Sequence, residues 1–342
     1  MSDLHCGRLP LQPHGRVLVC SPASVTGGTE LLHQFAAALR ARGHAAYMCY
    51  YPFSARLAAP GPFACYAVPQ TDFADEPGDL IVVPETFTGI IAAVRRARCA
   101  VWWLSVDNYF KRRGESRIAD AWQRALTLFG ERLPLRRMQH VEHWAQSFYA
   151  WNFLARYGIA SAMLSDYLSD VHFCAEKGQS RRAAVAFNPR KGVARTRALM
   201  KACPNIEFIP IEGVDAAGVR RLLQNVSIYI DFGHHPGKDR LPREAAMAGC
   251  CVITGRRGSA GNAVDVAVPQ RYKLDDQRNV SSYDFQDLVN SIFADFEKHQ
   301  RDFVEYREGI MRERAVFEAQ LDRLFGPGTC KMQLEKSSSR CG

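Results

Sequence analysis

Short apolar segments alternate with segments of helical periodicity in the first half of the chain, and this alternation narrows the choice of fold more than any other feature. Residues 30–42 place leucines and Phe35 on one face of a helix that Gly43 ends. A second helix is expected at 89–96. The expected strands, all short and apolar, are 17–20, 45–51, 80–83, 100–104 and 160–164. This order predicts a doubly wound parallel sheet.

The same alternation starts again in the second half. Strands are expected at 183–187, 207–211, 226–232 and 251–254, with helices at 193–202, 215–223 and 241–249 and one or two long helices within 284–324. We therefore predict an α/β protein of two doubly wound Rossmann-like domains facing a cleft. The expected parts are an N-terminal extension at 1–15, domains at 16–170 and 171–325, and a disordered tail at 326–342. Ligands of such sheets bind at the carboxyl ends of the strands.

The chain is basic, with a formal net charge of +9 over 342 residues. That balance suits an anionic partner: nucleic acid, an acidic membrane surface or a phosphorylated small molecule. No recognised nucleic-acid module is present, which places nucleic acid last. No apolar run reaches the ~18 residues that span a bilayer, and residues 1–16 lack the apolar core of a secretory signal. We expect a soluble, cytoplasmic protein.

Neither a metal nor a bound cofactor is expected from the sequence. The eleven cysteines include no Cys-x-x-Cys pair, so we interpret them as mostly buried, reduced thiols. His140 and His143 flank Glu142 at helical spacing, but without a third ligand such histidines are more typical of a surface or a core. There is also no Asp-x-Asp pair to hold a metal.

Glycine-rich and basic turns follow several of the expected strands. Gly27 and Gly28 open the first helix, where backbone N–H groups and the helix dipole favour an anion. Arg190 and Lys191 lie in the turn after the strand at 183–187. Motifs of the form G-x-G-x-x-G and G-x-x-x-x-G-K-[ST] are absent, which argues against a nicotinamide dehydrogenase and a P-loop NTPase.

The richest segment is 233–244, with the sequence GHHPGKDRLPRE. Lys238, Arg240 and Arg243 come before or within the first turn of the next helix, where a phosphate finds backbone donors and guanidinium partners. Glu244, in the same turn, can accept two sugar hydroxyls. Ser259 begins another small-residue loop, SAGN, that we expect near the phosphates. Each of these residues has an alternative interpretation. For Arg190 and Lys191 it is a turn exposed to solvent in place of a phosphate site, for Glu244 a helix start whose dipole the carboxylate complements, and for Ser259 an ordinary loop.

Taken together, these segments resemble GT-B fold glycosyltransferases, notably the large retaining family four. The opening resemblance is TGGTEL at 26–31 with LRARGH at 39–44. The second domain adds the Lys-Gly pair at 191–192 and the block LPREAAMAG at 241–249. The resemblance covers most of 16–325. It implies a sugar-nucleotide donor in the second domain, an acceptor on the first, and metal-independent transfer.

The chain departs from this family at one position. The family usually has two glutamates separated by seven residues, the first near the donor sugar and the second on the ribose. Glu244 matches the second, but Pro236 stands at the first. The retaining outcome is therefore left open. The resemblance also implies that Lys238, with the other cations, stabilises the leaving diphosphate.

Two carboxylates in the first domain are candidate catalytic residues. Glu85 follows the strand at 80–83 and Asp107 follows the strand at 100–104, so both are expected at strand carboxyl ends. An inverting transfer would use one of them as the general base for an acceptor hydroxyl. A loop-stabilising carboxylate is the alternative for each.

Residues 111–137 hold eight basic and three acidic residues, and apolar residues recur through them at helical spacing. A basic amphipathic helix of this kind suits peripheral contact with an anionic membrane that carries a lipid-linked acceptor. The alternative is a helix that packs on its own domain.

The sequence thus predicts a glycosyltransferase that moves a sugar from a nucleotide-diphosphate sugar to a glycan or glycolipid acceptor. The resemblance implies bacterial capsule, O-antigen or lipopolysaccharide assembly. A sugar-nucleotide epimerase of the same fold and a non-catalytic scaffold remain as alternatives.

Overall fold

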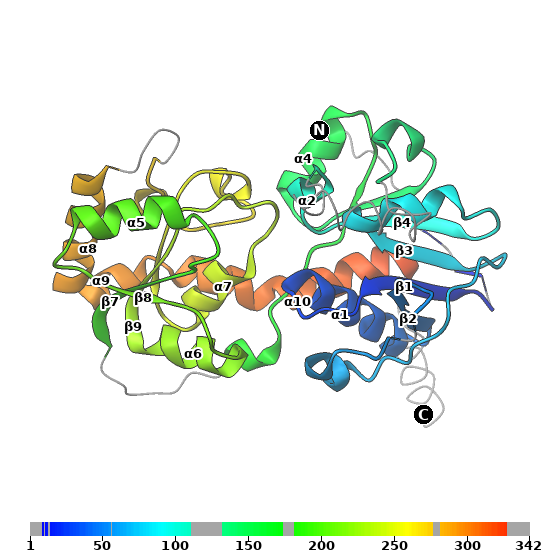
Figure 1. The fold of residues 1–342 in the computed structure, drawn as a ribbon, viewed down its shortest axis with the longest axis horizontal. Coiled ribbons are helices and arrows are strands. Elements are labelled where there is room, and N and C mark those ends of the chain that lie inside the picture. The colour runs from blue at the N-terminus through cyan, green and yellow to red at the C-terminus, as the bar shows by residue number, and fades with distance from the viewer. Residues whose placement is uncertain are drawn as a thin grey trace, which may run out of the picture. The chain divides into compact units, whose positions relative to one another are not determined.

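The computed structural model describes residues 9, 11–12, 14–55, 57–110, 132–173, 181–275 and 281–326. The chain divides into two compact units (Figure 1). The first unit consists of Met1–Asp166 together with Ala315–Gly342, and the second of Tyr167–Arg314.

The first unit is built on a six-stranded parallel sheet with the order β2-β1-β3-β4-β5-β6. Its strands are β1 Arg16–Pro22, β2 Ala45–Tyr51, β3 Leu80–Pro84, β4 Arg98–Trp103, β5 Glu142–Ala145 and β6 Ala162–Met163. The chain passes from β1 to β2 on one side and then returns to place β3 on the other. The carboxyl ends of β1 and β3 therefore flank the switch point where ligands bind in such sheets.

Helices α1 Gly27–Ala41, α2 Val106–Phe110 and α4 Phe148–Arg156 belong to this unit, with 3-10 helices η1 Gly61–Tyr66, η2 Glu85–Ala92 and η3 Leu135–Arg137. A capping box starts α1: Thr26 Oγ1 accepts from Thr29 N, and Thr29 Oγ1 accepts from Thr26 N. The apolar run at 17–20 is wholly buried because a parallel sheet is covered on both faces.

The second unit holds a four-stranded parallel sheet with the order β10-β9-β7-β8. Its strands are β7 Arg182–Phe187, β8 Glu207–Pro210, β9 Val226–Asp231 and β10 Cys251–Thr254. The helices are α5 Val193–Ala202, α6 Ala216–Asn225, α7 Arg240–Met247, α8 Ser282–Ala294 and α9 Phe296–Arg301, with η4 Asp170–Phe173, η5 Ser259–Gly261 and η6 Gln270–Tyr272. Helix α10, Val304–Phe325, belongs to this unit as far as Arg314 and to the first unit from Ala315 on. Helix α5 lies beside α8, and α6 beside α7 (Figure 1). The switch point lies between β7 and β9.

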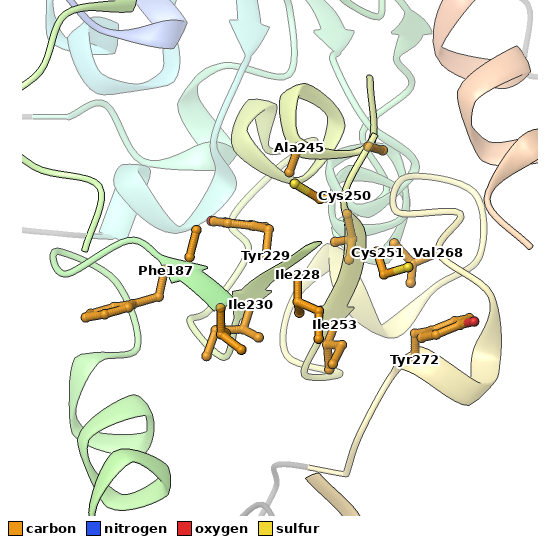
Figure 2. Close-up of a cluster of buried hydrophobic side chains, with 14 of the residues drawn as sticks. Phe187, Ile228, Tyr229, Ile230, Ala245, Cys250, Cys251, Ile253, Val268 and Tyr272 are labelled. Atoms are coloured by element: carbon orange, nitrogen blue, oxygen red, sulfur yellow. The ribbon is translucent and has the colours of Figure 1, made fainter. Parts of the chain in front are cut away.

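The core of the second unit is made by the central strands. Ile228, Tyr229 and Ile230 of β9 and Ile253 of β10 are buried together (Figure 2). Cysteines join this core as small apolar residues, as Cys251 does in Figure 2. Among the described residues, seven cysteines are free thiols, of which six are buried and Cys65 is exposed.

One expected helix is wrong, and two elements lie where the sequence pattern predicts none. The helix expected at 89–96 is the 3-10 helix η2, Glu85–Ala92, whose backbone breaks at Phe87 with φ −129° and ψ 29°. Threonines and Gly89 around that kink do not favour a regular α-helix. The sequence pattern does not predict strand β5 or helix α4, because both lie in a stretch interpreted as polar and basic.

The end of the chain also belongs elsewhere than expected. The sequence pattern places residues 315–325 in the second domain, whereas they pack on the first unit. Phe325 lies 6.0 Å from Phe35 between ring centroids, and Asp322 pairs with Arg42 at 2.9 Å. Residues 1–8 and 327–342, most of the expected extension and tail, lie outside the described residues.

Candidate functional site

The loops after β7 and β9 meet at the switch point of the second unit. Gly192, in the β7 loop, has a backbone φ of 63°, a value that residues other than glycine rarely adopt. A Cβ on Gly192 would lie 2.5 Å from the backbone nitrogen of Gly233 in the β9 loop. Only glycine allows the two loops to approach so closely, and their approach brings Lys191 to the carboxyl end of β9.

Lys191 there joins a compact ionic cluster with Asp231, His235 and Asp239, which we call the Lys191 cluster. The Lys191 ammonium pairs with Asp239 Oδ2 and lies 3.4 Å from Asp231 Oδ2. His235 is wholly buried, with Nδ1 2.6 Å from Asp239 Oδ2 and Nε2 3.5 Å from Asp231 Oδ1. Burial alone would raise the pKa of Asp239, but the contacts with His235 and Lys191 outweigh it and hold that pKa below its usual value.

The same residues include a possible set of metal ligands. One ligand atom each from Asp231, His235 and Asp239 lies within 4.8 Å of the others. The Lys191 ammonium, however, contacts both carboxylates and supplies the positive charge that a divalent ion would supply. The two carboxylates therefore form an ionic cluster with the lysine.

Two of the expected phosphate-binding cations are instead paired with α10. Arg243 is wholly buried, and its Nη1 donates to Glu313 Oε2 at 2.6 Å. Lys238 Nζ lies 2.7 Å from Glu313 Oε1, with 13% of its side chain exposed. The expectation that Arg243 faces a diphosphate is corrected by this placement, because its guanidinium points into the unit. The sequence indicates that α7 begins with cations but not which of them turns inward.

Arg240 and Glu244 lie one turn apart on α7. Arg240 Nε is 3.5 Å from Glu244 Oε1, and the same oxygen is 3.7 Å from His172 Nε2. The Glu244 side chain keeps 15% of its surface exposed. Arg190, in the turn after β7, is exposed. Glu244 is thus held in place by basic partners on two elements.

The loop after β10 is fixed to the loop after β9. Ser259 N donates to His235 O at 2.8 Å, and Ser259 Oγ donates to Gly237 O at 2.6 Å. Ser259 is wholly buried, so its hydroxyl holds the loop in this structure. Lys273, which sequence reasoning missed, donates to the carbonyls of Ala260 and Asn262 at 2.9 and 2.8 Å. Burial lowers the pKa of Lys273 to about 8.

At the switch point of the first unit, the glycine loop follows β1 and Glu85 follows β3. Gly27 and Gly28 open α1 after β1, and Glu85 follows β3 directly. Glu85 is 2% exposed, and its Oε2 accepts from Leu104 N at 2.9 Å. Burial raises the pKa of Glu85 to about 7, although hydrogen bonds from backbone N–H groups lower it in part.

Asp107, the other carboxylate expected to act as a base, lies in the short helix α2. Tyr149 of α4 donates a hydrogen bond to Asp107 Oδ1 at 3.4 Å. Asp107 is half-buried, and burial together with this carboxylate raises the pKa of Tyr149. Asp107 thus helps to join α2 to α4, and Glu85 is the more buried of the two carboxylates.

His143 belongs to the core, not to a metal site. Its Nδ1 accepts from Trp103 Nε1 at 3.0 Å, and its Nε2 lies 2.8 Å from Met138 O, so both ring nitrogens have protein partners. Of the basic segment expected at 111–137, residues 111–131 lie outside the described residues. No helix within the described ranges has both the length and the apolar character required to cross a bilayer.

No protein-family model matches the chain, and no curated protein matches it either. Solved structures do match over nearly its whole length. Sucrose-phosphate synthase from Thermosynechococcus elongatus is 12% identical, with a TM-score of 0.64, covering 95% of this chain and 100% of that chain. HepE from Anabaena in complex with UDP-glucose is 12% identical, with a TM-score of 0.60 and coverage of 90% and 99%.

WaaG, a glycosyltransferase involved in lipopolysaccharide biosynthesis, also matches at 12% identity, with a TM-score of 0.51 and coverage of 90% and 99%. At such identities the likeness concerns the fold. The prediction of an α/β protein with two Rossmann-like units of the GT-B type is confirmed.

Proposed function

We propose that the protein is a glycosyltransferase that moves a sugar from a nucleoside-diphosphate sugar to a glycan or glycolipid acceptor without a metal. The observation that carries this proposal is Lys191, which Gly192 allows to lie at the switch point of the second sheet. A cation there, next to strand carboxyl ends, suits a diphosphate. The fold shared with HepE, whose solved structure holds UDP-glucose, supports the same class of donor.

The second unit supplies the donor contacts in this proposal. Lys191 and the exposed Arg190 receive the two phosphates, and Arg240 borders them at the start of α7. Glu244, oriented by Arg240 and His172, accepts hydrogen bonds from ribose hydroxyls. As the bond from the sugar to the diphosphate breaks, the cations stabilise the charge that develops on the leaving group. The ribose role follows the resemblance to family four.

The first unit supplies the general base. Glu85, with a pKa of about 7, is half ionised near neutral pH, which suits proton removal from an acceptor hydroxyl. The proton passes to the Glu85 carboxylate while the hydroxyl oxygen forms the new bond to the sugar carbon and the diphosphate departs. A base in this role corresponds to an inverting transfer. Asp107 is the second candidate for the base.

A surface-glycan acceptor carried on a lipid is the class that the basic composition of 111–137 favours. WaaG, one of the proteins of similar fold, is described as acting in lipopolysaccharide biosynthesis. Co-sedimentation with vesicles that contain anionic lipid tests this part, with neutral vesicles as the control. Binding that does not depend on anionic lipid would contradict it.

Binding of a panel of UDP-, GDP-, ADP- and dTDP-sugars to the full chain tests the donor. We expect at least one to raise the melting temperature and to give a calorimetric Kd, with a loss of about tenfold or more in Lys191→Met. Lys201→Met, an exposed lysine on α5, is the matched control and should bind as the wild type does. If saturating sugar nucleotides leave the wild type unchanged, the proposal fails.

Product analysis separates the two alternatives. An epimerase would convert the donor alone into an isomeric sugar nucleotide, whereas a transferase releases nucleoside diphosphate in proportion to acceptor. A scaffold would bind no donor, and Glu244→Ala would leave cellular glycan unchanged while deletion of the protein altered it.

A further inference from the structure

Asp239 occupies the N-cap position of α7 but does not cap that helix. Its backbone is extended, with φ −63° and ψ 141°, as an N-cap residue usually is. An N-cap aspartate normally accepts a hydrogen bond from a backbone N–H of the first helical turn. Here no such side-chain bond forms, and the carboxylate contacts Lys191 and His235 instead.

The other carboxylate of the Lys191 cluster is fixed. Asp231 Oδ1 accepts from Gly233 N at 2.9 Å, and Asp231 Oδ2 accepts from Tyr229 Oη at 3.3 Å. Only 2% of the Asp231 side chain is exposed, against 24% for Asp239. Of the two anions on Lys191, Asp239 is therefore the one that solvent and a ligand can reach.

We propose that Asp239 is a displaceable internal anion that holds Lys191 until a phosphate group of the donor replaces it. The inference rests on the proposed function, because it concerns the same lysine. An incoming anion must replace a carboxylate on Lys191. A diphosphate brings more negative charge and more acceptor oxygens than a carboxylate does, so it competes better.

The N-cap position of Asp239 also offers its carboxylate a new partner after it leaves Lys191. Once its carboxylate leaves Lys191, it can accept from the N–H of Leu241 in the first turn of α7, where a negative charge is favourable. Pro242, the next residue, has no N–H to offer. The exchange therefore costs less than leaving a carboxylate without a partner.

Calorimetric titration of the full chain with inorganic pyrophosphate and with inorganic phosphate tests the inference in Asp239→Asn. We expect the variant to bind both anions more tightly, by a similar factor on the order of tenfold, because a competing charge is removed. Asp239→Ser, which can cap α7 but carries no charge, should behave in the same way even if the asparagine destabilises the loop.

Asp215→Asn is the matched control. Asp215 is also an N-cap residue in the second unit, but it caps its own helix by accepting from Gly218 N at 2.7 Å. Its replacement should leave both anion affinities unchanged. The inference is overturned if Asp239→Asn and Asp239→Ser bind the anions as weakly as the wild type or more weakly.

A metal-dependent result would also overturn the inference. If the wild type binds pyrophosphate only with Mn²⁺ or Mg²⁺ and Asp239→Asn abolishes that binding, then Asp231, His235 and Asp239 hold a metal. Failure of the proposed function looks different. In that case no sugar nucleotide binds to the wild type or to Asp239→Asn, while the gain in affinity for both inorganic anions persists.

Discussion

Arg243 and Glu313 form a buried ion pair in which Arg243 Nη1 donates to Glu313 Oε2 at 2.6 Å, with 1% and 8% of the side chains exposed. Lys238 pairs with the other oxygen of Glu313 at 2.7 Å. Glu313→Gln therefore removes the negative charge that both cations contact in the interior of the unit. We expect the free energy of unfolding of the second unit to fall by about 3 kcal/mol, as measured by urea denaturation.

An exposed pair on the same helix provides the control for that change. Glu308 lies 3.7 Å from Arg312, with 50% and 68% of the side chains exposed. Glu308→Gln should change the free energy of unfolding by less than about 0.5 kcal/mol. Equal effects of the two substitutions would contradict the assignment of Glu313 as a structural partner.

Gly192→Ala tests whether the close approach of the β7 and β9 loops positions the donor site. The new Cβ would lie 2.5 Å from Gly233 N and 2.6 Å from the carbonyl carbon of Phe232, so the β7 and β9 loops must move apart. Lys191 moves with them. We expect loss of sugar-nucleotide binding by about tenfold or more, measured by calorimetry, together with a lower melting temperature.

Gly213→Ala is the comparison for Gly192→Ala. Gly213 has nearly the same φ, 66°, but a Cβ there would meet nothing within 4 Å. This variant should lose about 1 kcal/mol from backbone strain and keep its donor affinity. If both alanine variants bind the donor equally well, the loop contact does not position the site.

Lys273→Met should produce a stability difference that depends on pH. The pKa of Lys273 is about 8 in the folded chain, below the ordinary 10.5, because the charged form is buried. Between these values the unfolded chain binds a proton that the folded chain has released, so wild-type stability rises with pH from that residue. The neutral amine has two N–H groups, so it can still donate to the carbonyls of Ala260 and Asn262.

The advantage of the wild type over Lys273→Met should therefore grow between pH 8 and pH 10. Thermal melts of both proteins at the two pH values measure it, and the difference between them cancels the groups that titrate in both. A constant or shrinking difference would show that Lys273 does not lose its proton on burial.

How far the sequence predicts the structure depends on where the deciding contacts lie. The apolar run at 17–20 predicts β1, because burial on both faces leaves a local signature. Strand β5 has no such local signature, because one of its buried residues is the polar His143. That side chain can be buried because Trp103 and Met138, which lie outside the strand, contact its ring nitrogens. Local pattern therefore indicated the sheets but not every strand.

The residues of the candidate site also fall into two groups, those that a local sequence pattern predicts and those whose orientation depends on a distant contact. The Lys-Gly pair at 191–192 and the strand ending before Glu85 are local, and both predicted positions lie at switch points. The orientation of the Arg243 side chain depends on its ion pair with Glu313, seventy residues away. The orientation of Lys273 depends on carbonyls of another loop. A single sequence does not reveal which distant partner a cation will meet, so these two assignments required the structure.

Glu85→Gln should reveal both a stability effect and a catalytic effect. The pKa of Glu85 is about 7 in the folded chain against 4.5 ordinarily. Between these values the folded chain holds a proton that the unfolded chain has lost, so Glu85 lowers wild-type stability as pH rises, by about 3 kcal/mol in total. Denaturation at pH 4.5 and pH 7.5 should show Glu85→Gln gaining on the wild type.

The catalytic effect has a separate signature in the pH profile. If the Glu85 carboxylate is the general base, wild-type kcat/KM rises with pH through about 7, as Glu85 ionises. Glu85→Gln should lose about 100-fold or more in kcat/KM with little change in donor affinity, and that rising limb should disappear. A variant that shows the stability change but keeps the wild-type rate and profile would assign Glu85 to the loop after β3, because a carboxylate that only accepts from Leu104 N has no role in proton transfer.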